Sequence, residues 1–150
     1  MGAELITRFY TAFQALDGEA MAACYAPDAT FSDPVFTHLQ GQDVGDMWRM
    51  LCSSAKDFSL TFDSVTDESA HWVARYSFSA TGRDVVNDIH AHFVISDGLI
   101  EGHQDTFRLW KWSRQALGPA GLALGWSPFM AAKIRAQALA GLRKYQKSQG

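Results

Sequence analysis

The spacing of the apolar residues changes once along the chain. From residue 5 to about residue 52 they recur every three or four positions, as on one face of a helix, and predict helices within residues 5–16, 19–25 and 44–52. From about residue 58 they alternate with polar residues, which is typical of strands that bury one face. A chain with its helices first and its strands afterwards predicts an α+β domain.

Four strands are predicted in the second half of the chain, after a short one at residues 29–33. They are FSLTFDSV, AHWVARYSFSA, VVNDIHAHFVI and LIEGHQDTFRLWKW. Asp97 and Gly98 join the last two, and both tolerate the positive φ of a two-residue type I′ hairpin. The short connections predict an antiparallel meander. Such a sheet would curl around the helices to cover its apolar face, and the curl would leave a cavity suited to a small molecule.

The charges divide the chain into an acidic body and a basic tail. All 16 Asp and Glu lie in residues 1–105, whereas residues 106–150 hold eight of the 13 Lys and Arg. Residues 116–132 carry no charge, but their Gly, Pro and Ser content argues against a membrane-spanning helix. Ser127 then begins a predicted basic amphipathic helix. We expect residues 113–150 to form a helical extension packed on the same domain or on a partner subunit, with peripheral membrane contact as an alternative.

Composition and motifs exclude several classes of protein. Hydrophobic residues make up 47% of the chain and charged residues 19%, which predicts an ordered domain. Cys24 and Cys52 lack a CxxC or His/Cys cluster, which favours reduced core thiols over a disulfide or a zinc site. The sequence contains no phosphate-binding loop, G-x-S-x-G motif or nucleic-acid-binding motif, so no nucleic-acid partner is expected. Its start shows no secretion or myristoylation signal, and a cytoplasmic location is expected.

Four segments occur in an order that is characteristic of one superfamily. They are RFYTAF, CYAPDATFSDPVF, GQDVGDMWRML and DGLIEGHQD. With these segments the chain resembles, over about residues 3–112, the nuclear transport factor 2-like superfamily, which includes ketosteroid isomerases, SnoaL-like polyketide cyclases and limonene epoxide hydrolases. The resemblance implies a domain at residues 1–112, folded as a conical barrel of a curved antiparallel sheet around N-terminal helices, with a deep pocket and usually a dimeric assembly. Because the superfamily also holds transport and scaffold proteins, the fold alone does not decide the function.

Two carboxylates carry the enzyme hypothesis that the resemblance suggests. Asp33, directly before Pro34, matches the Asp that moves a proton in ketosteroid isomerases. Asp105 matches the proposed acid–base Asp of SnoaL-like cyclases, and His103 lies two residues earlier on the same strand face. A carboxylate in an apolar pocket loses solvation, so its pKa rises and it becomes a better acid or base at neutral pH. The alternative for each Asp is a structural role, bonded to backbone N–H groups or to a basic side chain.

The chain departs from its relatives at other catalytic positions. Ketosteroid isomerases stabilise the enolate oxygen with a Tyr and a protonated Asp, whose matches here are Phe9 and Ala91. That oxyanion site is therefore expected to be absent, with Tyr10 a partial substitute. Limonene epoxide hydrolases use an Asp–Arg–Asp set, but the alternation around Arg75 predicts that this side chain faces outward.

The inward faces of the strands and helices predict the lining of the pocket. The residues expected to bind a ligand are Tyr10, Trp48, Trp72, Tyr76, Asn87, Phe93 and Phe107. Each of the aromatic ones has plain core packing as its alternative. His90 and His92 fall on the opposite face, and two histidines without a third ligand do not predict a metal site.

The sequence thus predicts a small-molecule protein, and the leading hypothesis is an isomerase-like or cyclase-like enzyme acting on a hydrophobic cyclic or polyketide-like ligand. No cofactor is expected, since proton transfer in a desolvated pocket needs only positioned acid and base groups. The expected partners are the small hydrophobic molecule and a second copy of the chain. The alternatives are a noncatalytic ligand-binding or scaffold domain and an epoxide hydrolase.

Overall fold

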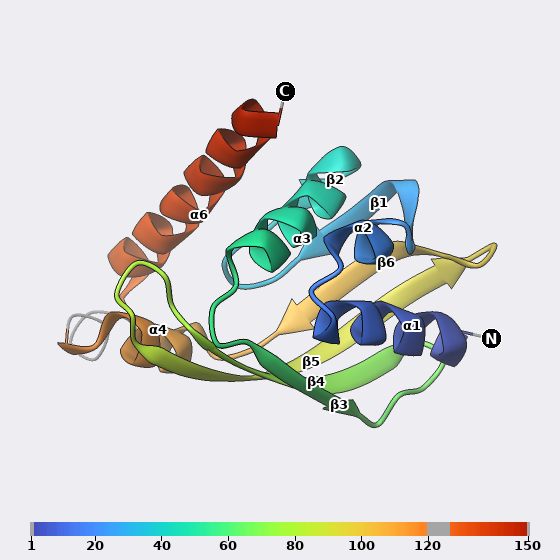
Figure 1. Cartoon of the computed structure of the whole chain (residues 1–150), viewed down its shortest axis with the longest axis horizontal. Helices are drawn as coiled ribbons and strands as arrows, with labels where there is room; N and C mark the ends of the chain where they lie inside the picture. Colours follow the sequence, from blue (N-terminus) through green and yellow to red (C-terminus); the bar gives the residue numbers. More distant parts are fainter. Residues whose placement is uncertain (1, 120–126, 150) are drawn as a thin grey trace.

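Helices cover one face of a curved sheet, and a long C-terminal helix stands at one end of the molecule (Figure 1). The computed structural model describes residues 2–119 and 127–149, so residues 120–126 of the uncharged stretch lie outside the described part. The helices are α1 (Gly2–Gln14), α2 (Gly18–Ala22), α3 (Gln42–Ser54), α4 (Leu109–Leu117) and α6 (Pro128–Gln149). The strands are β1 (Tyr25–Ser32), β2 (Leu39–Gln40), β3 (Ser59–Asp63), β4 (Ser69–Ser77), β5 (Asp84–Ser96) and β6 (Leu99–Thr106). The predicted α+β architecture is confirmed.

The six strands form one sheet in the order β2-β1-β6-β5-β4-β3. Strands β3 to β6 pair antiparallel with their neighbours in sequence, as the short connections predict. Strand β1, however, runs parallel to β6, so the sheet is mixed and not wholly antiparallel as predicted. The reason is that α3 and four strands separate β1 from β6 along the chain, and a connection of that length does not impose the antiparallel direction of a hairpin.

The β5–β6 hairpin has the predicted turn. Asp97 and Gly98 have φ values of 53° and 76°, and Ser96 pairs with Leu99 across the turn. Along β5, buried and exposed residues alternate strictly from Asp84 to Val94, as expected for a strand with one face on the core.

The end of β6 differs from the sequence prediction. The strand stops at Thr106, and residues 109–112, predicted to continue it, form the first turn of α4. The four residues LWKW fit a helical face as well as an alternating strand, because Trp112 is buried together with Ala116 one turn later. Gly118, with φ at 68°, ends the helix in the left-handed region that glycine adopts most readily. Helix α4 therefore crosses the domain boundary predicted after residue 112, and that boundary stays a prediction.

Helix α6 packs against the body of the chain. Leu142 has no exposed surface and belongs to the main core. Arg143 donates to both carboxylate oxygens of Asp43 at 2.8 and 2.9 Å. Gln146 Nε2 bridges Asp43 and Asp46 on α3 at 2.8 and 2.9 Å. Among the described residues, no helix combines the length and the apolar character needed to cross a membrane.

Replacement of Leu142 by Ala is expected to lower the free energy of unfolding by about 2–3 kcal/mol, because it leaves a cavity under α6. Leu139→Ala on the same helix is the matched control, since Leu139 is 42% exposed and its truncation is expected to cost less than about 0.5 kcal/mol. Urea unfolding followed by tryptophan fluorescence measures both. Equal small losses in the two variants would contradict the docking of α6 in solution.

Candidate functional site

A chain of three hydrogen bonds crosses the interior between α3 and the sheet. Trp48 Nε1 on α3 donates to the hydroxyl oxygen of Tyr25 at the start of β1 over 2.8 Å. The Tyr25 hydroxyl lies 2.7 Å from His103 Nδ1, and His103 Nε2 lies 2.8 Å from Asp105 Oδ1 on β6. Side chains from three elements therefore meet at His103, and two of the residues predicted to be catalytic belong to one network.

The direction of each hydrogen bond follows from which atoms can donate. An indole N–H can only donate, so the Tyr25 oxygen accepts from Trp48. A carboxylate oxygen can only accept, so His103 Nε2 donates to Asp105, and Nδ1 of a neutral imidazole then accepts from the Tyr25 hydroxyl. Burial, with a contribution from the charge of Asp105, raises the pKa of Tyr25 well above its usual value, so its hydroxyl remains a donor. The network thus presents Asp105 with an imidazole N–H donor.

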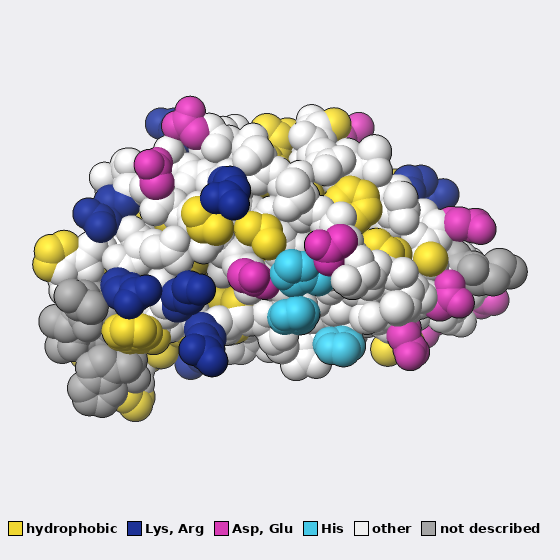
Figure 2. Space-filling model, turned by 90° about the horizontal axis from the view of Figure 1, so that it is seen from below, with side chains coloured by type: hydrophobic (Ala, Val, Ile, Leu, Met, Phe, Trp, Pro, Cys, Tyr) yellow, Lys and Arg dark blue, Asp and Glu magenta, His cyan; other side chains and the backbone are white. Residues whose placement is uncertain are grey.

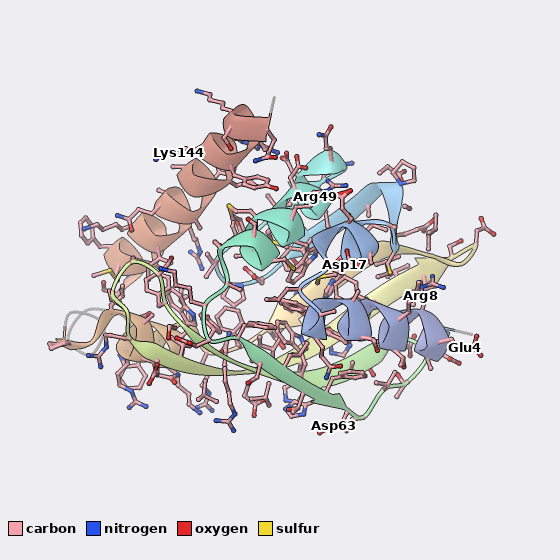
Figure 3. The ribbon with its side chains drawn as sticks, viewed as in Figure 1. Glu4, Arg8, Asp17, Arg49, Asp63 and Lys144 are labelled. Carbon is pink, nitrogen blue, oxygen red and sulfur yellow. The ribbon has the colours of Figure 1, made fainter. Side chains whose placement is uncertain are left out.

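Aromatic rings enclose His103. Its imidazole stacks on Phe93 with ring centroids 4.2 Å apart, and it meets the rings of Phe31 and Phe9 edge-on at 4.9 and 5.6 Å. The side chains of His103 and Asp105 are 0% and 2% exposed, and side chains fill the space between the helices and the sheet (Figure 3). A carboxylate in such surroundings interacts strongly with any charge that develops beside it, because little water screens the interaction.

Two buried donors of the same interior have no hydrogen-bond partner within the described part of the chain. They are the Tyr10 hydroxyl on α1 and Trp72 Nε1 on β4, whose rings lie 5.7 Å apart. The ring centroids of Tyr10 and Phe93 lie 6.3 Å apart, and Phe93 is the ring that stacks on His103. Burial, and next the charge of Asp105, raises the pKa of Tyr10 well above its usual value. Because an unpaired buried donor costs about 1–3 kcal/mol, these two groups are candidates to bind an oxygen atom of a ligand.

Asp33 lies in the turn that follows β1. Its Oδ1 accepts hydrogen bonds from the backbone N–H groups of Val35 at 2.7 Å and Phe36 at 2.6 Å. Burial nevertheless raises the pKa of Asp33 to about 7; the charge of Asp105 adds to the rise, and the two backbone donors oppose it. The backbone bonds are those of a structural turn residue, whereas a pKa near neutrality suits an acid–base group.

Asp33 and Asp105 lie at the same end of neighbouring strands. The parallel pairing of β1 with β6 matches Ser32 with Gln104, and one residue further lie Asp33, directly after the end of β1, and Asp105, still on β6. This closeness also explains why the charge of Asp105 helps to raise the pKa of Asp33, since two nearby carboxylates disfavour each other's charged form. The structure thus brings together the three residues predicted to be catalytic, Asp33, His103 and Asp105.

The C-terminal helices cover the end of the interior at which Asp33 lies. Trp112 Nε1 on α4 donates to the Tyr76 hydroxyl over 2.7 Å. Burial raises the pKa of Tyr76, and the charge of Asp33 adds to the rise. Arg135 on α6 donates from Nε to the carbonyl oxygen of Pro34 over 2.9 Å. Helices α4 and α6 therefore close this side of the site.

The residues predicted to bind a ligand divide between two apolar clusters. Tyr10, Trp48, Trp72 and Phe93 belong to the main core, and Asn87 is buried on the inward face of β5. Tyr76 and Phe107 are partly buried and pack against both the main core and a second cluster around Trp112 on α4. Their role in binding stays a prediction.

Two residues of the site were missed by reasoning from the sequence, Tyr25 and Trp112. A buried Tyr needs a hydrogen-bond partner for its hydroxyl, and that general requirement is the only signal available for Tyr25. Its partners lie 23 and 78 positions further along the chain, beyond any local pattern. Trp112 was assigned to a strand, and its place on α4 aims its indole N–H at Tyr76.

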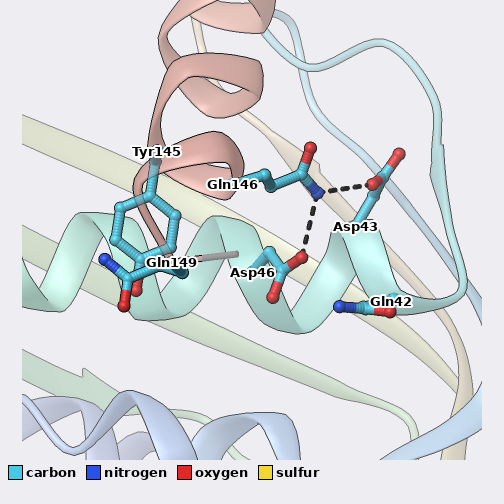
Figure 4. Close-up of a pocket in the computed structure, with 6 residues that line it drawn as sticks. All are labelled: Gln42, Asp43, Asp46, Tyr145, Gln146 and Gln149. Atoms are coloured by element: carbon cyan, nitrogen blue, oxygen red, sulfur yellow. Dashed lines mark hydrogen bonds between the residues drawn. The ribbon is translucent and has the colours of Figure 1, made fainter.

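A separate hollow of about 290 Å³ lies on the surface between α3 and α6 (Figure 4). Its lining residues are Gln42, Asp43, Asp46, Tyr145, Gln146 and Gln149. This lining contains none of the predicted site residues. Its amides and carboxylates already bond to one another, through Gln146 to Asp43 and Asp46, and do not suit a hydrophobic ligand.

The family of the chain follows from its sequence. A family model described as a SnoaL-like domain matches residues 6–103, which reach from α1 to His103 on β6. The chain belongs to the SnoaL-like domain family. Within this SnoaL-like domain, Asp105 lies two residues beyond the matched segment. No curated protein sequence matches the chain.

Solved structures similar to this SnoaL-like domain carry several functional names. A proposed polyketide cyclase from Silicibacter sp. is 19% identical, and the match covers 77% of this chain and 95% of that one with a TM-score of 0.65. A protein with a ketosteroid isomerase-like fold from Catenulispora acidiphila, in complex with trimethylamine, is 15% identical over 83% and 98% of the two chains with a TM-score of 0.65. An LEH-like epoxide hydrolase from M. tuberculosis is 16% identical over 81% and 92% with a TM-score of 0.63. At these identities the likeness shows the shared fold, and the reaction has to be argued from the site.

Proposed function

We propose that this SnoaL-like domain is a cofactor-independent acid–base enzyme of the isomerase or cyclase type, with Asp105 and Asp33 as its proton-transfer groups. The observation that carries the proposal is the buried network from Trp48 through Tyr25 and His103 to Asp105, beside Asp33 with its pKa near neutrality. A fully buried carboxylate with a directed donor on one oxygen is a costly arrangement for a core, and such groups cluster at functional sites.

The proposed substrate is a hydrophobic molecule with a carbonyl group and an acidic C–H bond beside it. Asp105 takes the proton from carbon, and the enolate oxygen that forms accepts hydrogen bonds from Tyr10 and Trp72, the two unpartnered donors. Asp33, whose pKa is about 7, gives its own proton to a second carbon, and the proton that Asp105 took then passes to Asp33 and resets both groups. The aromatic rings around His103 match a flat apolar substrate and exclude water from the enolate.

Deuterium incorporation tests this proposal without knowledge of the product. The wild type is incubated in D2O with panels of cyclic enones and polyketide-like β-dicarbonyl compounds, and exchange at carbon is measured by mass spectrometry. Asp105→Asn is expected to lower the exchange rate by about 10²–10⁴-fold, the usual contribution of a positioned acid or base. Asp28→Asn, an exposed Asp of β1, is the matched control and is expected to exchange at the wild-type rate. Equal rates in all three proteins would contradict a catalytic Asp105.

A noncatalytic ligand-binding or scaffold domain is the second candidate, and one observation favours it. The His103–Asp105 pair is almost without exposed surface, and α4 and α6 close the Asp33 end, so a substrate must displace part of this cover before it reacts. For this candidate we expect ligands from the same panels to raise the melting temperature without any exchange at carbon. A homodimer, a cytoplasmic location and the absence of a nucleic-acid partner remain predictions from the sequence and the superfamily.

A further inference from the structure

Histidine and carboxylate side chains gather on the outer face of the sheet, opposite the helices (Figure 2). His71 on β4 pairs directly with His90 on β5 and with Asp63 on β3, so the three form a row across neighbouring strands. The centroids of the two imidazole rings lie 4.9 Å apart. Asp88, two residues before His90 on the same strand face, reaches His71 as well.

The hydrogen bonds of His71 use both of its ring nitrogens. Nε2 lies 2.7 Å from Asp88 Oδ1, and Nδ1 lies 3.0 Å from Asp63 Oδ1. Asp63 on β3 thus contacts Nδ1 of His71, and Nε2 faces Asp88 on β5, the strand that also carries His90. A carboxylate on the far nitrogen of a histidine is the arrangement that orients metal-binding histidines in proteins.

We propose that His71, Asp88 and His90 form a binding site for Zn²⁺ on the outer face, with Asp63 orienting His71 from behind. One nitrogen from each histidine and one oxygen of Asp88 all lie within 4.8 Å of one another. In a tetrahedral zinc site with bonds of about 2.0–2.2 Å, the ligand atoms are about 3.3 Å apart. Small side-chain rotations close this difference, because the Asp88 side chain is 57% exposed and His90 is also exposed.

Zinc suits this set of ligands better than the hard cations do. Two imidazoles and one carboxylate are typical donors for Zn²⁺, whereas Mg²⁺ and Ca²⁺ prefer oxygen ligands alone. The ion would replace the proton now shared between His71 Nε2 and Asp88, and a water molecule would complete the tetrahedron. Since the ligands come from β4 and β5, the bound ion would join two strands that are already paired. The sequence showed only His90 and His92 on one strand, and strand pairing supplies the other ligands.

Isothermal titration of tag-free protein with ZnCl2 tests the site. We expect one Zn²⁺ per wild-type chain. In His71→Gln and in His90→Gln we expect binding to be more than about 100-fold weaker, a larger loss than removal of a residue that only orients a ligand would cause. Asp63→Asn, which removes only the carboxylate behind His71, is expected to weaken binding about tenfold. His92→Gln is the matched control, an exposed histidine of β5 outside the cluster, and is expected to bind as the wild type does.

A second measurement separates the site from a general effect of histidine. Zn²⁺ is expected to raise the melting temperature of the wild type and of His92→Gln, and to leave that of His90→Gln unchanged. The wild-type spectrum with Co²⁺ in place of Zn²⁺ is expected to show the strong visible bands of a tetrahedral ion. Undetectable binding by the wild type, or loss of binding in His92→Gln equal to that in His90→Gln, would overturn the proposal. Because the side chains lie on the surface, all variants are expected to fold, and circular dichroism checks this.

Discussion

Replacement of His103 by Leu is expected to destabilise the protein by about 3–5 kcal/mol, because removing one partner of a buried pair leaves the carboxylate of Asp105 without compensation. Leu fills the space of the imidazole among the aromatic rings but donates nothing to Asp105, whose side chain is 2% exposed. Tyr25 loses its acceptor at the same time. Tyr25→Phe, which removes one neutral hydroxyl from the same network, is expected to cost less, about 1–3 kcal/mol.

The double variant His103→Leu/Asp105→Leu shows whether the loss comes from the stranded carboxylate. Replacing both members of a buried pair by apolar residues is often neutral or stabilising, so we expect the double variant to be more stable than His103→Leu alone. Urea unfolding of the wild type, the single variants His103→Leu and Asp105→Leu, and the double variant completes the cycle. Strictly additive losses would contradict the direct coupling of His103 and Asp105 that their 2.8 Å contact implies.

Local patterns predicted those parts of the fold that short-range physics determines. The alternation along β5 correctly placed His90 and His92 on the outer face and Asn87 and Phe93 on the inner one. The Asp97-Gly98 turn was predictable because a type I′ turn needs positive φ at two successive positions, and few residue types tolerate it. The helix–strand order was enough for the fold class, since it leaves few ways to cover one apolar face.

Contacts between distant segments were not predictable in the same way. The parallel pairing of β1 with β6, which sets Asp33 beside Asp105, joins segments that are 70 residues or more apart in sequence. The Tyr25 hydroxyl finds its two partners on α3 and β6, and the four side chains of the outer-face cluster, Asp63, His71, Asp88 and His90, come from three strands. The resemblance to a superfamily indicated Asp33 and Asp105 separately, and only the sheet register relates one to the other.

Asp33→Asn is expected to change the pH dependence of stability. A carboxyl whose pKa rises from 3.8 in the unfolded chain to about 7 in the folded one keeps its proton on folding between these pH values. The folded state then binds more protons than the unfolded state, so the free energy of unfolding falls as pH rises from about 4 to 7 and is level above that. The pKa shift corresponds to a fall of about 2–4 kcal/mol in the free energy of unfolding, a range that allows for the partial exposure of Asp33 to solvent. Asn can accept the same two backbone hydrogen bonds without the charge, so the variant should lack this fall.

The measurement is urea unfolding of wild type and Asp33→Asn at pH 4, 5, 6, 7 and 8, with Asp28→Asn as the control for loss of an exposed β1 carboxylate. The sign of the result decides between the two roles of Asp33. If burial and Asp105 dominate, the wild type loses stability relative to Asp33→Asn as pH rises, and the carboxyl is an acid–base group near neutrality. If the N–H groups of Val35 and Phe36 dominate, the wild type gains stability instead, because their bonds at 2.7 and 2.6 Å favour the charged form. That second outcome would make Asp33 a turn residue and leave Asp105 as the one carboxylate able to move a proton in this site.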